Sequence, residues 1–267
     1  MPHYVEKTSG EKELFDAEKL KRSLKKAGAD GNLIDVILRE ITAQQPQTTQ
    51  EIHAIVSGFL QKITPPIAAR YNLKRALIEL GPIGFPFEQF IAHILQAQDF
   101  HTKTNQIIRG ACVEHEIDVI TEKQHKYAMV ECKFHNSLGT KTDIQVALYT
   151  QARFEDIKKT EQFHEAWIVT NTQFTSEVIK YGECMRIQLL GWNYPTSKGL
   201  AHLIDTLGIH PITALQELTA QHKRELIKQG LVLCRDANKY QHAFKSLGFT
   251  DHRIKKIIEQ AEAVCRL

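Results

Sequence analysis

Glu116-Ile117-Asp118-Val119 and Glu131-Cys132-Lys133, with twelve residues between Asp118 and Glu131, decide the fold of the middle of this chain. Apolar and polar residues alternate in the first stretch, and a short apolar run leads into the second. This pattern predicts two strands joined by a polar hairpin loop at residues 121–126. Because strand side chains alternate between faces, Glu131 and Lys133 share one face. Asp118, on the neighbouring strand, meets that face in a suitable register.

The residue types in this pattern suit phosphoryl chemistry. Carboxylate oxygens are the ligands that Mg²⁺ prefers, and such sites often use one or two carboxylates with phosphate and water. A bound metal lowers the pKa of an attacking water, and a nearby lysine offsets developing negative charge. Two acidic residues and a lysine in this arrangement therefore suffice to place a divalent metal and to stabilise a phosphoryl transition state. Taken alone, the pattern also fits a solvated hairpin with ordinary surface charges.

The flanking segments predict an α/β domain. Apolar residues at helical spacing follow Pro86, and a second helix begins at Asp143. The further elements expected are a strand at 166–170, a helix at 174–183 and a strand at 185–190. The order is helix, three strands, helix, strand, helix, strand. Such alternation predicts a mixed sheet that is flanked by helices.

This central part resembles the PD-(D/E)xK nucleases, and more closely the Mrr-type restriction endonuclease domain. The resemblance covers roughly residues 84–205. In that superfamily a helix glutamate precedes a strand aspartate, then an E/Q-x-K strand, then a helix. The matching residues here are Glu88, Asp118, Glu131 and Lys133. The resemblance implies that Asp118, Glu131 and the Cys132 carbonyl bind Mg²⁺ or Mn²⁺ and that Lys133 is catalytic.

Further residues match a subgroup related to the RecB nuclease. Gln145 and Tyr149 fit its Q-x-x-x-Y pattern, and residues 168–175 resemble the strand-to-helix step that follows. Glu116 departs from the family, which often has a glycine there. The alternative for Gln145 and Tyr149 is packing on a helix surface. The alternative for Glu88 is a helix N-terminal residue that the helix dipole favours.

The amino-terminal segment, residues 1–83, is expected to be a separate, mostly helical unit. A hairpin around Ser9-Gly10 precedes amphipathic helices at about 17–27, 32–43, 49–63 and 66–80. Thr48-x-x-Glu51 is a capping-box sequence at the start of the third helix. The only stretch dense in glycine and proline, residues 81–86, marks the predicted boundary.

This segment resembles the ATP-cone, an allosteric nucleotide-binding module. The motif runs from Val5 to Lys19, with Thr8 where the family usually has an arginine. The nucleotide contacts that the resemblance implies are Lys7, Glu13, Asp16, Lys19 and Thr49. Since the chain has no Walker-type phosphate loop, ATP is expected as an allosteric ligand and not as a substrate. A helical interaction domain without a ligand is the alternative.

Composition bounds the remaining inferences. The net charge is only +3, but residues 220–267 hold ten Lys/Arg against five Asp/Glu. A small helical domain at 205–267 is therefore expected, and either it grips a phosphate backbone or its basic face is simply solvated. The five cysteines form no C-x-x-C pair, which fits a reducing compartment. We expect no signal peptide, no membrane span and a cytoplasmic location.

The sequence thus predicts a Mg²⁺-dependent DNA endonuclease of restriction-enzyme type. An ATP-cone regulator precedes it and a basic helical domain follows it. Cleavage of both strands of duplex DNA needs two sites, so a two-fold symmetric homodimer is expected. Two alternatives stay open. One is a structure-specific DNA-processing nuclease such as a junction resolvase, and the other is a nucleotide-sensing DNA-binding protein that does not cleave.

Overall fold

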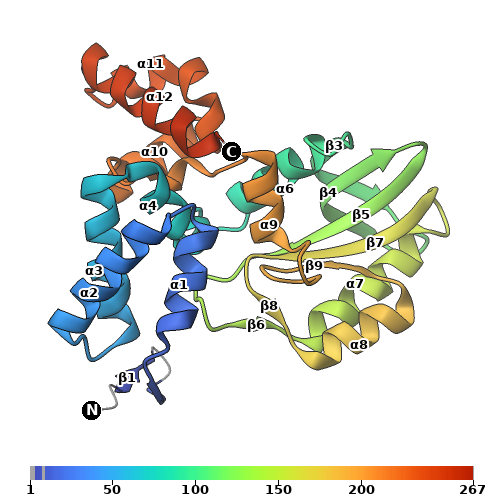
Figure 1. Ribbon diagram of the computed structural model, residues 1–267. Helices are drawn as coiled ribbons and strands as arrows, with labels where there is room; N and C mark the ends of the chain where they lie inside the picture. Colours follow the sequence, from blue (N-terminus) through green and yellow to red (C-terminus); the bar gives the residue numbers. More distant parts are fainter. Residues whose placement is uncertain (1–3, 8–9, 267) are drawn as a thin grey trace.

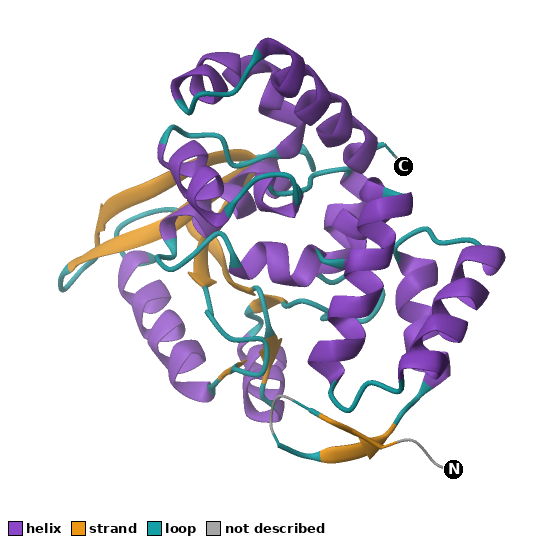
Figure 2. Ribbon diagram, turned by 90° about the vertical axis from the view of Figure 1, so that its left-hand side faces the viewer, coloured by secondary structure: helices purple, strands orange, loops and turns teal. Residues whose placement is uncertain are grey.

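The computed structural model describes residues 4–7 and 10–266. Its amino-terminal region is a short antiparallel hairpin followed by five helices, and Figure 2 shows that hairpin at the outer edge of the helices. These elements are β1 (Tyr4–Glu6), β2 (Lys12–Leu14), α1 (Ala17–Lys26), α2 (Gly31–Gln44), α3 (Thr49–Ile63), α4 (Pro65–Tyr71) and α5 (Leu73–Ile78). The predicted turn at Ser9-Gly10 lies partly outside the described residues, as does Thr8.

Side-chain caps set where these helices begin. Asp16, Asp30 and Thr48 each accept a hydrogen bond from a backbone N–H of the first turn, as N-cap residues do. The predicted capping box at Thr48 differs in one bond. The Glu51 carboxylate accepts from the backbone N–H of Gln47 at 2.6 Å, whereas in a capping box it would accept from the backbone N–H of the N-cap residue, Thr48.

The helix expected at 66–80 is divided into α4 and α5 at Asn72. The Asn72 amide nitrogen donates to the Ala68 carbonyl at 2.8 Å, and its oxygen accepts from the Ser57 hydroxyl at 2.7 Å. Its side chain therefore bonds the turn that α4 ends on, which competes with continuation of the helix.

The central region is a five-stranded mixed sheet between two layers of helices, so the predicted α/β fold is confirmed. The strand order is β3-β4-β5-β7-β9, antiparallel from β3 to β5 and parallel from β5 to β9. The elements are α6 (Phe85–Gln96), β3 (His101–Arg109), β4 (Glu114–Lys123), β5 (Lys126–Lys133), β6 (Lys141–Thr142), α7 (Ile144–Ile157), β7 (Phe163–Thr170), β8 (Gln173–Phe174), α8 (Ser176–Met185), β9 (Gln188–Leu190) and α9 (Leu200–Leu207).

The two faces of the sheet bury separate apolar clusters. Residues of α6 and α9 pack on one face against Val119, Val130 and Val169. Residues of α7 and α8 pack on the other face, against Met129 and Ile168. Figure 1 shows the two helix pairs on opposite sides of the sheet. Burial on both faces explains why the inner strands β5 and β7 are apolar runs and not alternating ones.

The carboxy-terminal region is helical, as predicted. Its elements are η1 (Ile212–Ala214), α10 (Ala220–Lys228), η2 (Cys234–Tyr240), α11 (Gln241–Ser246) and α12 (Asp251–Cys265). Thr250 caps α12. Residues 212–228 form a short 3₁₀ turn and α10, with an irregular link between them. None of the described helices is both long and apolar enough to cross a bilayer.

Helices α4 and α5 contact both of the regions that follow. Ala69 and Ala76 belong to the apolar cluster of the carboxy-terminal helices, whereas Leu73 and Leu77 belong to the cluster under α6. Lys223 of α10 forms an ion pair with Glu79 at 2.6 Å. The division into units at residues 1–83, 84–204 and 205–267 stays a prediction, and residues 65–80 have partners in all three.

Candidate nuclease site

The β4–β5 hairpin positions the residues of the D-x12-E-x-K pattern. Its register pairs Val119 with Val130, which leaves Asp118 and Glu131 at the next opposed positions. The Asp118 carboxylate accepts a hydrogen bond from the Cys132 amide at 2.7 Å. Lys133, the last residue of β5, is exposed. The structure therefore places the aspartate beside the E-x-K segment, in the register that the pattern requires.

The hairpin loop is shorter than the sequence indicates. The polar residues expected as a loop at 121–126 mostly extend the strands, and only Gln124 and His125 form the turn. Both have positive φ, 53° and 63°. Two left-handed residues are typical of the two-residue turns whose twist matches that of the strands. The short turn fixes the register that brings Asp118 opposite Glu131.

The alternation of side chains along β4 is interrupted at Asp118, so that the residues before and after it point to opposite faces of the sheet. Ile117 packs in the cluster with α7, whereas Val119 packs in the cluster with α6. Two residues so spaced on a regular strand would share a face. The ladder with β3 is interrupted at Asn105, which has a φ of 52° and stands opposite Asp118. This kink lets the carboxylate reach the Cys132 amide across the hairpin.

Arg153, which the sequence analysis missed, pairs with Glu131. Its guanidinium forms an ion pair with the Glu131 carboxylate and lies 5.1 Å from the centre of the Tyr149 ring. The arginine side chain is 8% exposed and that of the glutamate 17%, so the pair is largely desolvated. Gln145, Tyr149 and Arg153 recur every four residues on α7, which is the signal that would have found the arginine.

Four carboxylates share the electrostatic field of the site. Burial, followed by the charge of Glu131, raises the pKa of Asp118 to about 6. Burial also raises the pKa of Glu88 to about 7, with contributions from Asp118, Glu116 and Glu131. Glu116 thus contributes to the site, although the sequence showed it only as a departure from the family pattern. Such crowding of negative charge suits a bound cation.

The donor set at this site is compatible with a Mg²⁺ centre that has few protein ligands. No three His, Cys, Asp or Glu residues within 4–7 and 10–266 are arranged to hold a metal together. Asp118 and Glu131 would supply two carboxylates, the common number for Mg²⁺, which keeps several waters. The Cys132 side chain is buried, and its amide already binds Asp118.

The remaining predicted catalytic residues lie around this hairpin. Glu88 is in the first turn of α6 and is half-buried. Gln145 and Tyr149 are exposed on the first two turns of α7. The tyrosine ring is next to the Arg153 guanidinium, so its contact with the site passes through that residue.

The predicted nucleotide contacts gather in the amino-terminal region. Glu13, Asp16, Lys19 and Thr49 line one cavity of about 190 Å³, whose apolar wall includes Phe15 and Tyr71. Lys7 lies beside it, with its ammonium 2.8 Å from Glu13. The Asp16 carboxylate also caps α1 by accepting from the Lys19 amide.

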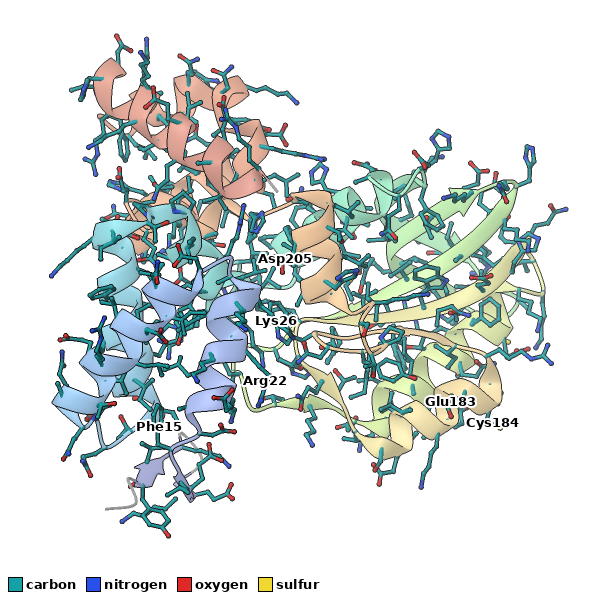
Figure 3. The ribbon with its side chains drawn as sticks, viewed as in Figure 1. Phe15, Arg22, Lys26, Glu183, Cys184 and Asp205 are labelled. Carbon is teal, nitrogen blue, oxygen red and sulfur yellow. The ribbon has the colours of Figure 1, made fainter. Side chains whose placement is uncertain are left out.

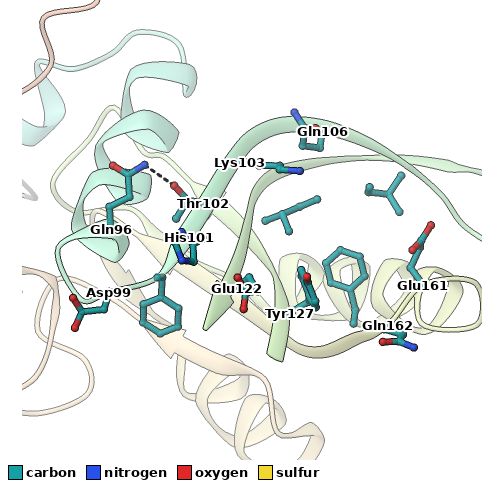
Figure 4. Close-up of a pocket in the computed structure, with 14 residues that line it drawn as sticks. Gln96, Asp99, His101, Thr102, Lys103, Gln106, Glu122, Tyr127, Glu161 and Gln162 are labelled. Atoms are coloured by element: carbon teal, nitrogen blue, oxygen red, sulfur yellow. Dashed lines mark hydrogen bonds between the residues drawn. The ribbon is translucent and has the colours of Figure 1, made fainter. Parts of the chain in front are cut away.

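A larger cavity of about 1280 Å³ lies elsewhere, on β3 and β4 beyond the end of α6 (Figure 4). Its polar lining includes Gln96, Lys103, Gln106 and Glu122. None of the predicted catalytic residues lines it, so size alone does not mark the candidate site.

Comparison with known proteins agrees with the architecture of the central and carboxy-terminal regions. A family model described as restriction endonuclease matches residues 84–193, and one described as AF1548-like, C-terminal, matches residues 210–265. An uncharacterised protein of Archaeoglobus fulgidus is 39% identical over 175 residues, which are 65% of this chain and 99% of that protein.

One solved structure is clearly similar to this chain. The crystal structure of AF1548, a protein of unknown function, is 38% identical and has a TM-score of 0.58. The match covers 68% of this chain and 97% of that one. A protein from Vibrio cholerae, VC1899, is 16% identical with a TM-score of 0.33, too low to support an argument. The chain therefore belongs to the AF1548-like family and carries a restriction-endonuclease domain at residues 84–193.

Proposed function

We propose that this protein is a Mg²⁺- or Mn²⁺-dependent DNA endonuclease that hydrolyses phosphodiester bonds at Asp118, Glu131 and Lys133. One observation carries the proposal. Two partly buried carboxylates on adjacent strands meet beside a lysine, within a domain of the restriction-endonuclease family. Duplex DNA is the substrate that such a domain implies.

Asp118, Glu131 and the Cys132 carbonyl would hold the metal. The donors fit, because both carboxylates are largely buried, and burial followed by the charge of Glu131 raises the pKa of Asp118. Domains of this superfamily usually use Mg²⁺, which activates water and neutralises charge at phosphorus. In the structure the Arg153 guanidinium offsets the charge of Glu131. A bound cation would take over part of that role.

The other side chains have roles that follow from their places. Lys133 would orient the attacking water or offset charge on the phosphate oxygens. Glu88, whose pKa is raised to about 7, would accept or donate a proton near neutral pH. Gln145 and Tyr149 would contact the DNA backbone from the exposed face of α7.

We further propose that the amino-terminal region is an ATP-cone that regulates the nuclease. The cavity lined by Glu13, Asp16, Lys19 and Thr49 supports this, since it gathers the residues that the motif implies. ATP bound there would change the shape or the assembly of the protein. A homodimer would supply two nuclease sites for double-strand cleavage. The basic helices at 220–267 would contact the phosphate backbone.

Cleavage of supercoiled plasmid tests the nuclease proposal. The protein is assayed without metal, with Mg²⁺ and with Mn²⁺, each with and without ATP. Branched and methylated DNA serve as further substrates, and Glu131→Gln is the inactive variant. Metal-dependent nicking or linearisation that the variant lacks is expected. Cleavage confined to branched DNA would identify a structure-specific nuclease. Binding of DNA without cleavage of any substrate would favour the nucleotide-sensing DNA-binding protein.

A further inference from the structure

Two cysteines and a histidine meet where the nuclease domain joins the carboxy-terminal helices. His210 follows α9, Cys234 begins η2 and Cys265 ends α12. Asp205 of α9, labelled in Figure 3, has its carboxylate 3.6 Å from His210 Nε2. Asp205 and His210 are close in sequence, whereas Cys234 and Cys265 come from η2 and α12, so tertiary folding brings the two cysteines to this pair.

Backbone contacts hold this cluster together. The Cys234 amide donates to the His210 carbonyl at 2.8 Å, and the Cys234 thiol donates to the Pro211 carbonyl at 3.1 Å. The Cys265 carbonyl lies so close to Gly208 that a Cβ added there would be 2.5 Å away. Cys234 lies in the buried apolar cluster of the carboxy-terminal helices, and the Cys265 side chain packs against that cluster. The Cys265 thiol interacts electrostatically with both Cys234 and His210.

His210 is an unusual histidine. It is 1% exposed, and within the described part of the chain neither ring nitrogen has a hydrogen-bond partner of normal length. A buried polar group without a partner costs free energy, so its retention indicates a role beyond packing. The imidazole stands between the Asp205 carboxylate and the Cys265 thiol, and these two residues are suited to stabilise an imidazolium and a thiolate respectively.

The cluster is better suited to thiol chemistry than to metal binding. No three His, Cys, Asp or Glu residues of the described chain are placed to share a metal ion. Cys234 is buried, and Cys265 is partly exposed. A partly exposed cysteine packed near a buried second cysteine is an arrangement that can form a disulfide upon oxidation.

We propose that Cys265 is a peroxide-sensitive cysteine that Cys234 resolves into a disulfide, with His210 as the proton carrier. The Cys265 thiolate attacks one oxygen of hydrogen peroxide and breaks the O–O bond. The products are a sulfenic acid and hydroxide, which takes a proton from His210 to become water. Cys234 then loses its proton to His210 and attacks the sulfenic sulfur, and the hydroxide that departs takes this proton back from His210 and leaves as a second water. Two thiols and one peroxide give one disulfide and two waters.

The electrostatics of the cluster agree with these roles. The Cys234 thiol and His210 lower the pKa of Cys265, although burial opposes them. Burial opposes protonation of His210, yet Asp205 and Cys265 raise the pKa of the imidazole on balance. Burial raises the pKa of Cys234, as suits a thiol that reacts only after its neighbour is oxidised.

The bond would join η2 to the end of α12 beside the link from the nuclease domain. Arg70 of α4 donates to the carbonyl of Val264, the residue before Cys265. Oxidation would therefore fix the carboxy-terminal helix against both η2 and the amino-terminal region. This inference does not depend on the nuclease activity.

Peptide mapping of the full-length protein tests the proposal. Iodoacetamide at pH 7 should modify Cys265 at least about tenfold faster than the exposed Cys112 and Cys184. His210→Asn should remove that advantage while the other two rates stay unchanged. Equimolar hydrogen peroxide should yield a Cys234–Cys265 linked peptide. With Cys234→Ala, dimedone should instead trap a sulfenic acid at Cys265. Alkylation of Cys265 more slowly than Cys112 in the wild type, or peroxide-treated protein without the linked peptide, would overturn the proposal.

Discussion

One hydrogen bond, from the Cys132 amide, stabilises the charged form of the Asp118 carboxylate, whereas burial and the charge of Glu131 destabilise it. Its pKa is 3.8 in the unfolded chain and about 6 in the folded protein. A raised carboxyl pKa means that folding favours the protonated form, so this group lowers stability as pH rises from about 4 to 6. The penalty is complete above pH 6. A residue whose pKa is shifted in this way is typical of functional sites.

Asp118→Asn is therefore expected to stabilise the metal-free protein. Asparagine keeps the acceptor for the Cys132 amide but carries no charge. The free energy of unfolding at pH 8 in EDTA should increase by about 1–3 kcal/mol, and by less at pH 5. Urea unfolding at the two pH values measures this. An equal change at both would show that ionisation of Asp118 is not the cause.

Arg153 and Glu131 form a largely desolvated ion pair beside Asp118. Arg153→Met leaves a desolvated carboxylate without its partner, so it should reduce stability by about 3–5 kcal/mol in the absence of metal. Arg153→Met with Glu131→Gln should recover most of that loss. Lys158→Met, which removes an exposed pair with Glu155, is the matched control and should change stability by less than about 1 kcal/mol. Additive losses in the double variant would contradict this coupling.

The sequence identified the residues whose spacing is local and missed those that depend on tertiary placement. The D-x12-E-x-K pattern lies within one hairpin, so Asp118, Glu131 and Lys133 could be proposed directly. Arg153 continues the four-residue spacing of Gln145 and Tyr149, but its ion pair with Glu131 depends on how α7 packs on the sheet.

At the scale of elements, the order of the main helices and strands from α6 to β9 was predicted, although β3 was given no residue range and the short strands β6 and β8 were not predicted. Lengths were harder to predict, because polar residues at the tip of the β4–β5 hairpin remain in strands that are solvated on one side. The division of the helix at Asn72 also depends on a side-chain hydrogen bond from another helix, that of Ser57. Neither effect leaves a periodic signal in the sequence.

The turn between β3 and β4 depends on Asp156 of α7. Its carboxylate accepts from the Cys112 amide at 2.9 Å, the Val113 amide at 3.3 Å and His115 Nε2 at 2.8 Å. Chiefly through His115, these bonds hold the pKa of Asp156 well below its usual range. Because the folded pKa is depressed, this stabilisation is present above about pH 4 and is lost as pH falls below that.

Asp156→Ala should accordingly loosen this turn. Amide exchange at residues 110–115 should become faster at pH 7, and Tm should fall by several degrees, because two backbone donors lose their acceptor. At pH 2 the difference in Tm from the wild type should shrink. Exchange in the Gln124–His125 turn is the internal control and should not change. Unchanged exchange at 110–115 would mean that the turn holds without Asp156.

At the scale of the whole molecule, α4 and α5 connect the three regions. Sequence composition placed the first boundary at the glycine- and proline-rich residues 81–86. Composition could not show that Ala69 and Ala76 fill a core made mostly by residues 212–264, because such contacts join segments far apart in the chain. A signal from the amino-terminal cavity would reach the nuclease domain through Leu73 and Leu77, which pack under α6.

Nucleotide binding at the amino-terminal cavity should raise the stability of the whole protein. ATP at about 100 times its Kd should increase the free energy of unfolding by about 2.7 kcal/mol, seen as a higher Tm. Lys19→Gln should abolish the shift, because it removes a charge that lines the cavity. Lys12→Gln, on the exposed face of the β1–β2 hairpin, should keep it. The same ATP shift in both variants would place the nucleotide elsewhere.

The central claim is that Asp118 and Glu131 support metal-dependent hydrolysis of DNA. Its most direct test is the initial rate of plasmid nicking in Mg²⁺ by wild type, Asp118→Asn and Glu155→Gln, with unfolding curves to show that all three are folded. Loss of at least about 100-fold in Asp118→Asn, with Glu155→Gln close to wild type, is the predicted result. Equal nicking by wild type and Asp118→Asn would contradict the assignment of this site.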